Sequence, residues 1–258
     1  MFEEGIQMVL RKLVGYSMNR DFVIFAHRGA AHHYPENTLP AFREALRLGA
    51  SGLEMDVQLT KDGYPVVIHD FSVNRTTNGR GLVKNHTLEE IKALSAGSWF
   101  HPRFARLKIP TLEEVLFKVK ELPIQLNIEL KNLLIKNENL ESEVIRLVCK
   151  YKMEKQIYLS TFNPESISRI RQLNPSIQTS FLYFGILEEP WKMAYELGAT
   201  CIQPPIIALT RDTVRASQEL GLKVFPYHVN HWREIQRSLD LGVDGVITMY
   251  PERVRKIL

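Results

Sequence analysis

Short apolar segments recur along the chain, and each is followed by a segment whose apolar residues repeat with the period of a helix. This alternation predicts a strand and then a helix, repeated along the chain. We expect eight main strands. They are FVIFAH (22–27), GLEMDVQL (52–59), QLNIEL (125–130), QIYLST (156–161), IQTSFL (177–182), TCIQPP (200–205), LKVFPYH (222–228) and VDGVIT (243–248).

Several of the intervening helices begin and end at recognisable residues. Asn163 is followed by Pro164, which predicts an N-cap and a first helical residue. The tetrapeptide TLEE occurs at Thr87 and again at Thr111, with a glutamate at the position that completes a capping box. Glycines stand where helices should end, at Gly49, Gly198 and Gly221.

Strands that alternate with helices in this way predict an α/β fold, a (β/α)8 TIM barrel. A doubly wound open sheet is the alternative, but no glycine-rich dinucleotide motif follows the first strand. The length of 258 residues suits one barrel, and no repeat, low-complexity tract or linker divides the chain. We therefore expect a single domain over residues 1–258, in which residues 1–20 form an N-terminal extension without an assigned function.

One apolar segment does not fit the parallel pattern. VVIH (66–69) follows the second strand after only KDGYP (61–65), which is too short for a parallel crossover. Asp62 and Gly63 are typical of a tight turn. We predict that VVIH pairs antiparallel with the second strand as a hairpin arm. The long stretch after it, roughly residues 71–108, is predicted to be a small insertion lobe over the mouth of the barrel.

Composition and charge narrow the class of protein. Apolar residues make up 45% of the chain and the net charge is +4, without a dense basic block. That argues against a nucleic-acid partner, although the positive charge would attract an anionic substrate. Cys149 and Cys201 lack metal-site or redox-motif spacing and are expected to be reduced thiols. The N-terminal segment has neither a secretory signal nor a membrane span, so we expect a cytoplasmic protein without stable membrane insertion, of open oligomeric state.

Three acidic side chains are expected to point into one end of the barrel, where the active sites of such barrels lie. Glu54 and Asp56 are two residues apart on the second strand and share one face, and Glu129 lies on the next barrel strand. Their mutual repulsion would raise their pKa values unless a cation neutralises them, and carboxylate oxygens suit Mg²⁺ or Ca²⁺. The alternative is that each acid pairs with a base such as Arg28 or Lys131.

Two histidines are expected at the same end of the barrel. His27 closes the first strand and His69 ends the hairpin arm. Imidazoles titrate near neutral pH, so one can accept a proton while the other donates one. Arg28, beside His27, offers a forked donor for a phosphate. A metal, an arginine and paired imidazoles favour phosphoryl transfer, and no G-x-S-x-G motif indicates a serine hydrolase.

A series of segments then gives a family resemblance. HRG, PENTLPAF, LEMDVQLTKDG, PVVIHD, RTTNGRG, GSWF, IPTLEEVL and NIELK resemble, in this order, the glycerophosphodiester phosphodiesterase family of the bacterial, cytosolic type. The resemblance continues more loosely through LSTFNPESI, VFPYHVN and GVDGVIT. It implies a barrel with a lobe inserted after the second strand. It also implies hydrolysis of a small glycerophosphodiester to sn-glycerol 3-phosphate and an alcohol, with one divalent cation, Mg²⁺ or Ca²⁺.

Matched residue by residue, the resemblance also implies roles for single side chains. His27 and His69 would be the catalytic acid and base, in either order. Asn37 falls in the family's EN pair, but it is equally expected to be the N-cap of the helix at TLPAF. The other implied roles are metal ligation by Glu54, Asp56 and Glu129, and substrate or phosphate binding by Arg28, Lys131, Glu36 and Asn37.

The chain departs from the family pattern at the far side of the mouth. Tyr227 and His228 stand where relatives often have tryptophan and threonine, and Met249 stands where many have an acid or amide. His228 is expected to be either a third titrating group or a polar residue that faces the substrate. Trp99 and Phe100 are expected to form the small core of the insertion lobe or an apolar wall for a lipid tail.

Two other functions fit the same residues. With Trp99, Phe100 and Phe104 as an apolar groove, the enzyme would remove the head group of a lysophospholipid, as lysophospholipase D relatives do. The other possibility is a barrel that binds phosphodiesters without catalysis, although a pure binder would not need both His27 and His69. For the hydrolase, the nucleophile is either water or the neighbouring glycerol hydroxyl, which would pass through a cyclic phosphate.

Overall fold

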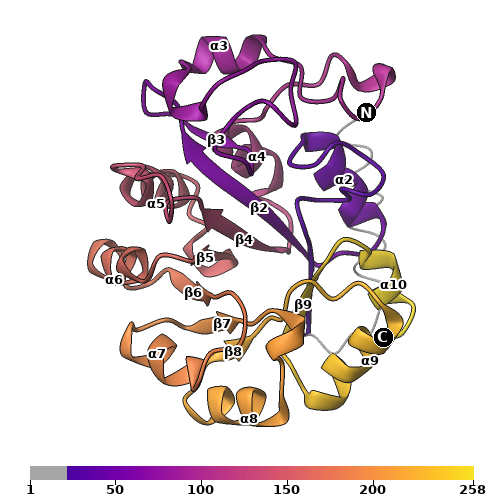
Figure 1. Ribbon diagram of the computed structural model, residues 1–258, viewed down its shortest axis with the longest axis vertical. Helices are drawn as coiled ribbons and strands as arrows, with labels where there is room; N and C mark the ends of the chain where they lie inside the picture. Colours follow the sequence, from indigo (N-terminus) through magenta and orange to yellow (C-terminus); the bar gives the residue numbers. More distant parts are fainter. Residues whose placement is uncertain (1–21) are drawn as a thin grey trace.

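The computed structural model describes residues 22–258, and the extension predicted over residues 1–20 lies outside the described residues. Its strands surround a central axis and its helices lie outside them (Figure 1). The strands are β1 (Val23–Ala26), β2 (Gly52–Leu59), β3 (Pro65–Val67), β4 (Gln125–Leu130), β5 (Ile157–Thr161), β6 (Gln178–Leu182), β7 (Cys201–Gln203), β8 (Lys223–Val224) and β9 (Gly245–Thr248).

All strands except β3 pair in parallel, in the order β8-β7-β6-β5-β4-β2-β1-β9. The two ends of this order meet, because Ile247 N donates to Pro226 O at 3.0 Å and Val229 N donates to Ile247 O at 2.9 Å. A parallel bridge between Tyr227 and Ile247 completes the closure. The predicted TIM barrel is therefore confirmed, and the open doubly wound sheet is excluded.

The helices follow the strands as the alternating pattern predicts. Thr87 and Thr111 form complete capping boxes, and the side chain of Asn163 accepts a hydrogen bond from Glu165 N. The helices are α2 (Leu39–Arg47), α3 (Leu88–Ala93), α4 (Leu112–Val119), α5 (Leu140–Lys150), α6 (Pro164–Leu173), α7 (Pro190–Glu196), α8 (Arg211–Glu219), α9 (Trp232–Leu241) and α10 (Pro251–Arg255), with short 3₁₀ turns at Val83–Asn85, Pro102–Phe104, Glu154–Gln156 and Ile206–Ala208.

Apolar side chains fill the barrel and the layer around it. Inside the barrel, the rings of Phe25 and Tyr158 both meet Phe225 edge to face, with centroid distances of 5.3 Å. Cys201 is buried in the same cluster as a free thiol. These side chains close the interior, which leaves the carboxyl ends of the strands as the place for a site.

The hairpin arm is present as predicted. β3 pairs antiparallel with β2, with Val57 opposite Val67. Residues 71–108 then form a lobe, which includes α3 and lies beyond the end of β2 in Figure 1. Its small apolar core is aliphatic and comprises Val66, Ile68, Val73, Val83, Ile91, Ala96 and Ile109.

The capping box of α4 allows a direct test of the local sequence signal. Glu114 N donates to Thr111 Oγ1 at 3.0 Å, so Thr111→Ala leaves that N–H without its acceptor. The substitution should lower the free energy of unfolding by about 1 kcal/mol. Thr111→Ser keeps the hydroxyl and should stay within about 0.5 kcal/mol of the wild type. Urea unfolding measures both, and equal losses in the two variants would contradict the capping role.

Candidate active site

Three carboxylates meet at the carboxyl end of the barrel. Glu54 and Asp56 project from β2 and Glu129 from β4, and the strand register places Asp56 opposite Glu129. One oxygen atom from each of the three lies within 4.8 Å of the others. The alternation of a strand explains the arrangement, because Leu53 and Met55 point the other way and join the core under the helices.

Burial and mutual repulsion change the pKa values of the three carboxylates. Burial and the neighbouring Asp56 raise the pKa of Glu54 well above its ordinary value, and the same causes raise the pKa of Glu129 to about 7. Burial alone would also raise the pKa of Asp56, but Arg28 and Lys131 outweigh it, and the net shift is downward. Asp56 Oδ1 is buried and accepts no hydrogen bond from the described residues. The site thus has three hard oxygen donors and an unused buried lone pair, which fits a divalent cation.

Two basic side chains supply the compensation that exists. The guanidinium Nε of Arg28 lies 3.3 Å from Asp56 Oδ2, while the backbone N–H of Arg28 donates to Glu54 Oε2 at 2.8 Å. Lys131 Nζ donates to Glu129 Oε1 at 2.7 Å. Of the ion pairs expected as the alternative to a metal, those of Asp56 and Glu129 are present, whereas Glu54 accepts a hydrogen bond from the backbone N–H of Arg28. Two cationic side chains face three carboxylates, so a further positive charge would be needed to balance the negative charge.

The turn after β1 depends on a glycine. Gly29 has a φ of +78°, and a Cβ there would lie 2.7 Å from the carbonyl carbon of Ala41 in α2. Only glycine tolerates both this backbone conformation and this close approach. The HRG sequence thereby holds Arg28 N against Glu54 while the chain passes close to α2.

Glu36 and Asn37 contact the charged residues and do not line the main cavity. Asn37 Nδ2 donates to Asp56 Oδ2 at 2.9 Å, and Glu36 Oε1 accepts from Arg28 Nη1 at 2.9 Å. The alternative N-cap role for Asn37 is wrong, since Thr38 is the N-cap residue of α2. The side chain of Asn37 instead donates a hydrogen bond to Asp56, which is 19 residues away in the sequence. Local sequence patterns do not predict this tertiary contact.

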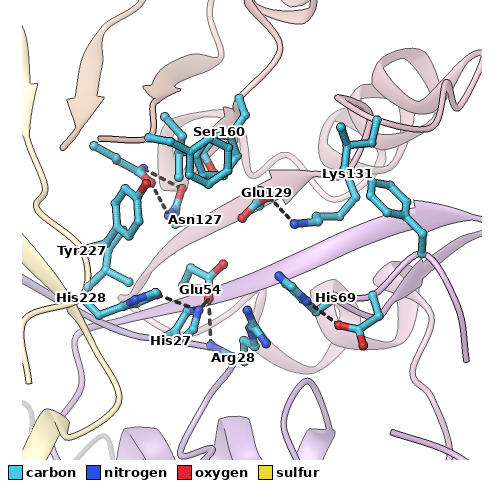
Figure 2. A pocket seen from close by; sticks show the side chains of 18 residues that line it. His27, Arg28, Glu54, His69, Asn127, Glu129, Lys131, Ser160, Tyr227 and His228 are labelled. Carbon is cyan, nitrogen blue, oxygen red and sulfur yellow. Dashed lines mark hydrogen bonds and ion pairs between the residues drawn. The ribbon is translucent and has the colours of Figure 1, made fainter. Parts of the chain in front are cut away.

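The two predicted histidines line the same cavity. Figure 2 shows His27 beside Arg28 at the end of β1, with His69 on the neighbouring segment after β3. Burial lowers the pKa of both imidazoles, and His228 lowers that of His27 further. Both rings are therefore neutral near pH 7. A neutral imidazole can accept a proton and pass it on.

A chain of charged groups orients His69, and it includes Arg75, which the sequence analysis did not name. Its Nδ1 lies 2.7 Å from Asp70 Oδ1, and Arg75 Nε donates to Asp70 Oδ2 at 2.7 Å. Arg75 also donates two hydrogen bonds to Glu36, of 2.8 and 2.9 Å. Hydrogen bonds from Arg75 and then from His69 hold the pKa of Asp70 well below its ordinary value. Asp70 is thus a permanent anion that fixes the ring of His69.

His228 contacts His27 directly. Their Nε2 atoms are 3.0 Å apart, and the ring centroids are 4.0 Å apart. Burial and the positive charge of Arg28 lower the pKa of His228 to about 4. One of two neutral rings must then donate and the other accept, so the tautomers of His27 and His228 are coupled. His228 lies in the cavity, as expected for a residue at the far side of the mouth, whereas Met249 is not among the lining residues.

The cavity has a volume of about 440 Å³ and two unlike walls. One wall carries the charged groups above, and the other carries side chains that the sequence analysis had not assigned. The alternation of side chains along a strand could have predicted that polar residues such as Asn127 and Ser160 face the inside of the barrel. No sequence pattern predicts which loop residues reach the cavity. The unassigned lining residues are Phe71, Asn127, Leu134, Ser160, Phe162, Leu182, Phe184, Gln203 and Ile247.

The aromatic groove predicted in the lobe does not line this cavity. Trp99 packs edge to face on Phe100, and its Nε1 donates to Ala96 O at 3.1 Å. Phe104 packs on Phe100 and on Tyr34. These rings form a small aromatic contact of the lobe, separate from its aliphatic core. The apolar surface next to the charged residues comes from the opposite side of the barrel.

Comparison with known proteins identifies the family. The sequence profile of the glycerophosphoryl diester phosphodiesterase family matches residues 27–253. The chain belongs to this family. It is 41% identical over 230 residues to a glycerophosphodiester phosphodiesterase of Caldanaerobacter subterraneus subsp. tengcongensis, covering 89% of this chain and 95% of that one. It is 39% identical over 237 residues to the enzyme of the same name from Bacillus altitudinis, covering 91% and 97%.

Solved structures agree with the fold. A glycerophosphodiester phosphodiesterase from Agrobacterium tumefaciens superposes with a TM-score of 0.82 at 28% identity, covering 91% of this chain and 99% of that one. An Oleispira antarctica phosphodiesterase, solved with its product sn-glycerol-3-phosphate, gives a TM-score of 0.83 at 28% identity, covering 91% and 95%. The predicted enzyme class, a glycerophosphodiester phosphodiesterase, is confirmed. Within residues 22–258, no helix is long and apolar enough to cross a membrane.

The raised pKa of Glu129 predicts a pH dependence of stability. Between its ordinary pKa of 4.5 and the folded-state pKa of about 7, the unfolded chain has released a proton that the folded protein retains. The free energy of unfolding of the metal-free protein should therefore fall as pH rises through this range, by up to about 1.4 kcal/mol per pH unit. Glu129→Gln should flatten that slope in denaturant unfolding at each pH, and identical slopes would contradict the assignment.

The contact between Asp70 and His69 predicts a loss of rate. Asp70→Asn removes the negative charge that orients and stabilises the imidazole, so kcat should fall about tenfold or more with a smaller change in KM. Asp62→Asn is the matched control, because Asp62 accepts hydrogen bonds in the β2–β3 turn, outside the cavity. Phosphodiesterase kinetics of both variants test the point, and a wild-type kcat for Asp70→Asn would show that the charge has no role.

Proposed function

We propose that the enzyme hydrolyses glycerophosphodiesters to sn-glycerol 3-phosphate and an alcohol, with one divalent cation, Mg²⁺ or Ca²⁺, and with His27 and His69 as acid and base. One observation carries the proposal. Two half-buried neutral imidazoles line a cavity together with Glu54 and Glu129, and Asp56 lies within 4.8 Å of these two carboxylates. We also propose that it acts in the cytoplasm on a small-molecule substrate, without a nucleic-acid partner or stable membrane insertion.

The carboxylates of Glu54, Asp56 and Glu129 would hold the cation. Its chemistry would be to offset the charge of a phosphate oxygen and to withdraw electron density from phosphorus. The unused lone pair of Asp56 Oδ1 and the raised pKa values of the two glutamates support this choice.

Arg28 and Lys131 would bind the remaining phosphate oxygens. Both line the cavity, and both already interact with the carboxylates that surround the proposed cation. Glu36 and Asn37 would act on substrate binding through these neighbours, Glu36 by holding the guanidinium of Arg28 and Asn37 by holding Asp56.

The two histidines would move the protons. One removes the proton from the attacking hydroxyl, and the other protonates the oxygen of the departing alcohol. Asp70 holds His69 through Nδ1, which leaves its Nε2 available for the substrate. The attacking group is either water or the neighbouring glycerol hydroxyl, and both routes use the same pair of imidazoles.

The direct test is release of glycerol 3-phosphate from glycerophosphocholine. Purified protein should release it with added Mg²⁺ or Ca²⁺ and lose the activity in EDTA. His27→Ala and His69→Ala should each lower kcat about 100-fold or more. His33→Ala is the control, because His33 is exposed in the loop after β1 and does not line the cavity.

Two results would overturn the assignment. The first is a failure to release glycerol 3-phosphate with either metal. The second is a wild-type kcat in His27→Ala. Tight binding of the substrate without turnover would instead favour the non-catalytic barrel.

A further inference from the structure

One polar side chain of the cavity has no role in the function proposed above. His228 lies in the segment between β8 and α9 and lines the cavity beside His27 (Figure 2). Its ring is half-buried, and burial and then Arg28 lower its pKa to about 4, so it is uncharged near pH 7. A neutral imidazole has one N–H donor and one acceptor nitrogen. His228 therefore offers the cavity a hydrogen-bonding group without charge.

Closure of the barrel fixes the backbone on both sides of His228. On one side, Tyr227 N donates to Pro204 O at 2.9 Å, just beyond the end of β7. On the other side, Val229 N donates to Ile247 O of β9, also at 2.9 Å. The backbone that carries His228 is therefore hydrogen-bonded to both neighbouring strands of the barrel, and the position of its ring does not depend on a free loop.

The two imidazoles of the proposed acid–base pair have partners of different kinds. Nδ1 of His69 contacts the carboxylate of Asp70, whereas Nε2 of His27 contacts the uncharged ring of His228. The same Nε2 of His27 lies 3.9 Å from Glu54 Oε2. Nε2 is thus the nitrogen of His27 that faces the carboxylates, and it is the one that would exchange a proton with a substrate held beside them.

The hydrogen bond between His27 and His228 has to break for that exchange. An imidazole nitrogen has either one N–H or one lone pair in the ring plane, so it makes one strong hydrogen bond at a time. A substrate oxygen that exchanges a proton with His27 comes within about 2.6–3.2 Å of Nε2 and replaces His228 as its partner. Nε2 of His228 is 3.0 Å from the same atom, so it would then lie next to the substrate without a partner. An unpaired polar atom in a half-buried position costs free energy unless the substrate supplies a new partner.

We propose that His228 exchanges its hydrogen bond with His27 for one to the substrate, and that its Nε2–H donates to an oxygen of the bound phosphate group; this rests on the function proposed above. Phosphate oxygens are acceptors, so a neutral N–H donor suits them, and His228 stays uncharged throughout. Proton transfer remains with His27 and His69, which lie on opposite sides of Glu54 in Figure 2. Threonine, which relatives often have at position 228, is shorter and has no ring, so this phosphate contact would distinguish the chain from them.

The test measures binding of glycerol 3-phosphate by calorimetry, with Mg²⁺ or Ca²⁺ present. H228A should raise Kd about fivefold, because a hydrogen bond to a charged phosphate is worth more than the ring-to-ring bond that binding breaks. H228Q keeps a neutral N–H donor and should stay within about threefold of wild type. H231N is the matched control, because His231 lies on the same segment, is exposed and does not line the cavity.

A double-mutant cycle separates this contact from a role in positioning alone. In the variant H27A, no ring-to-ring bond has to break, so adding H228A should raise Kd about tenfold or more, a larger loss than in the wild type. If His228 acted only by holding His27, adding H228A to H27A would change nothing. ¹⁵N NMR gives a second readout, since the coupling between the two Nε2 atoms across their hydrogen bond should disappear when glycerol 3-phosphate binds.

Several results would overturn the proposal. They are a wild-type Kd in H228A, a loss of affinity that is absent in the H27A background, a ring-to-ring coupling that persists in the saturated complex, and no binding of glycerol 3-phosphate by the wild type with either metal. If H228A does not fold, H228T makes the same comparison. Glycerophosphocholine turnover is measured in parallel. Turnover by the wild type with an unchanged Kd in H228A would refute the role of His228 alone. No turnover, with the loss of affinity in both backgrounds, would refute the proposed hydrolysis and support the phosphate contact.

Discussion

Uncompensated negative charge at the carboxyl end of the barrel is the constraint on which the rest of the site depends. Glu54, Asp56 and Glu129 lie within 4.8 Å of one another on rigid strands, where they cannot turn away from each other. Arg28 and Lys131 offset part of the charge, but they are two cations against three carboxylates. Such repulsion reduces the stability of the folded state and prepares it for a cation.

The insertion lobe extends the same network of charges. Arg75, near the start of the lobe, joins Asp70 to Glu36, and Glu36 in turn holds Arg28. The lobe residue Arg75 therefore acts on His69 through Asp70, while His27 is positioned by the barrel. Because β3 pairs with β2, the strand that carries two of the three acids, the hairpin and the lobe hold their positions relative to the carboxylates. The arrangement explains how a long insertion beside the mouth contributes to the site.

The opposite half of the mouth has a different character. Its charged groups are few, and the stacked rings of Phe162 and Phe184 lead to exposed aliphatic side chains. The rigid strands supply the reactive groups, and the loops that follow β4, β5 and β6 supply the apolar wall. This division lets substrate preference change through loop residues without disturbing the carboxylates or imidazoles.

Alternation along single strands, turn chemistry and helix caps are local, and the sequence determined them. It was enough to predict the barrel, the hairpin at Asp62 and Gly63, and the face shared by Glu54 and Asp56. Closure of the barrel decided what no local pattern contains, because it brings together side chains far apart in the chain. The contact of His27 with His228, 201 residues away, is of this kind, and so is the position of Leu134 and Phe184 in one cavity. Asn37 shows the limit of prediction from local patterns. Its side chain donates to the distant carboxylate of Asp56, and Thr38 is the N-cap residue of α2.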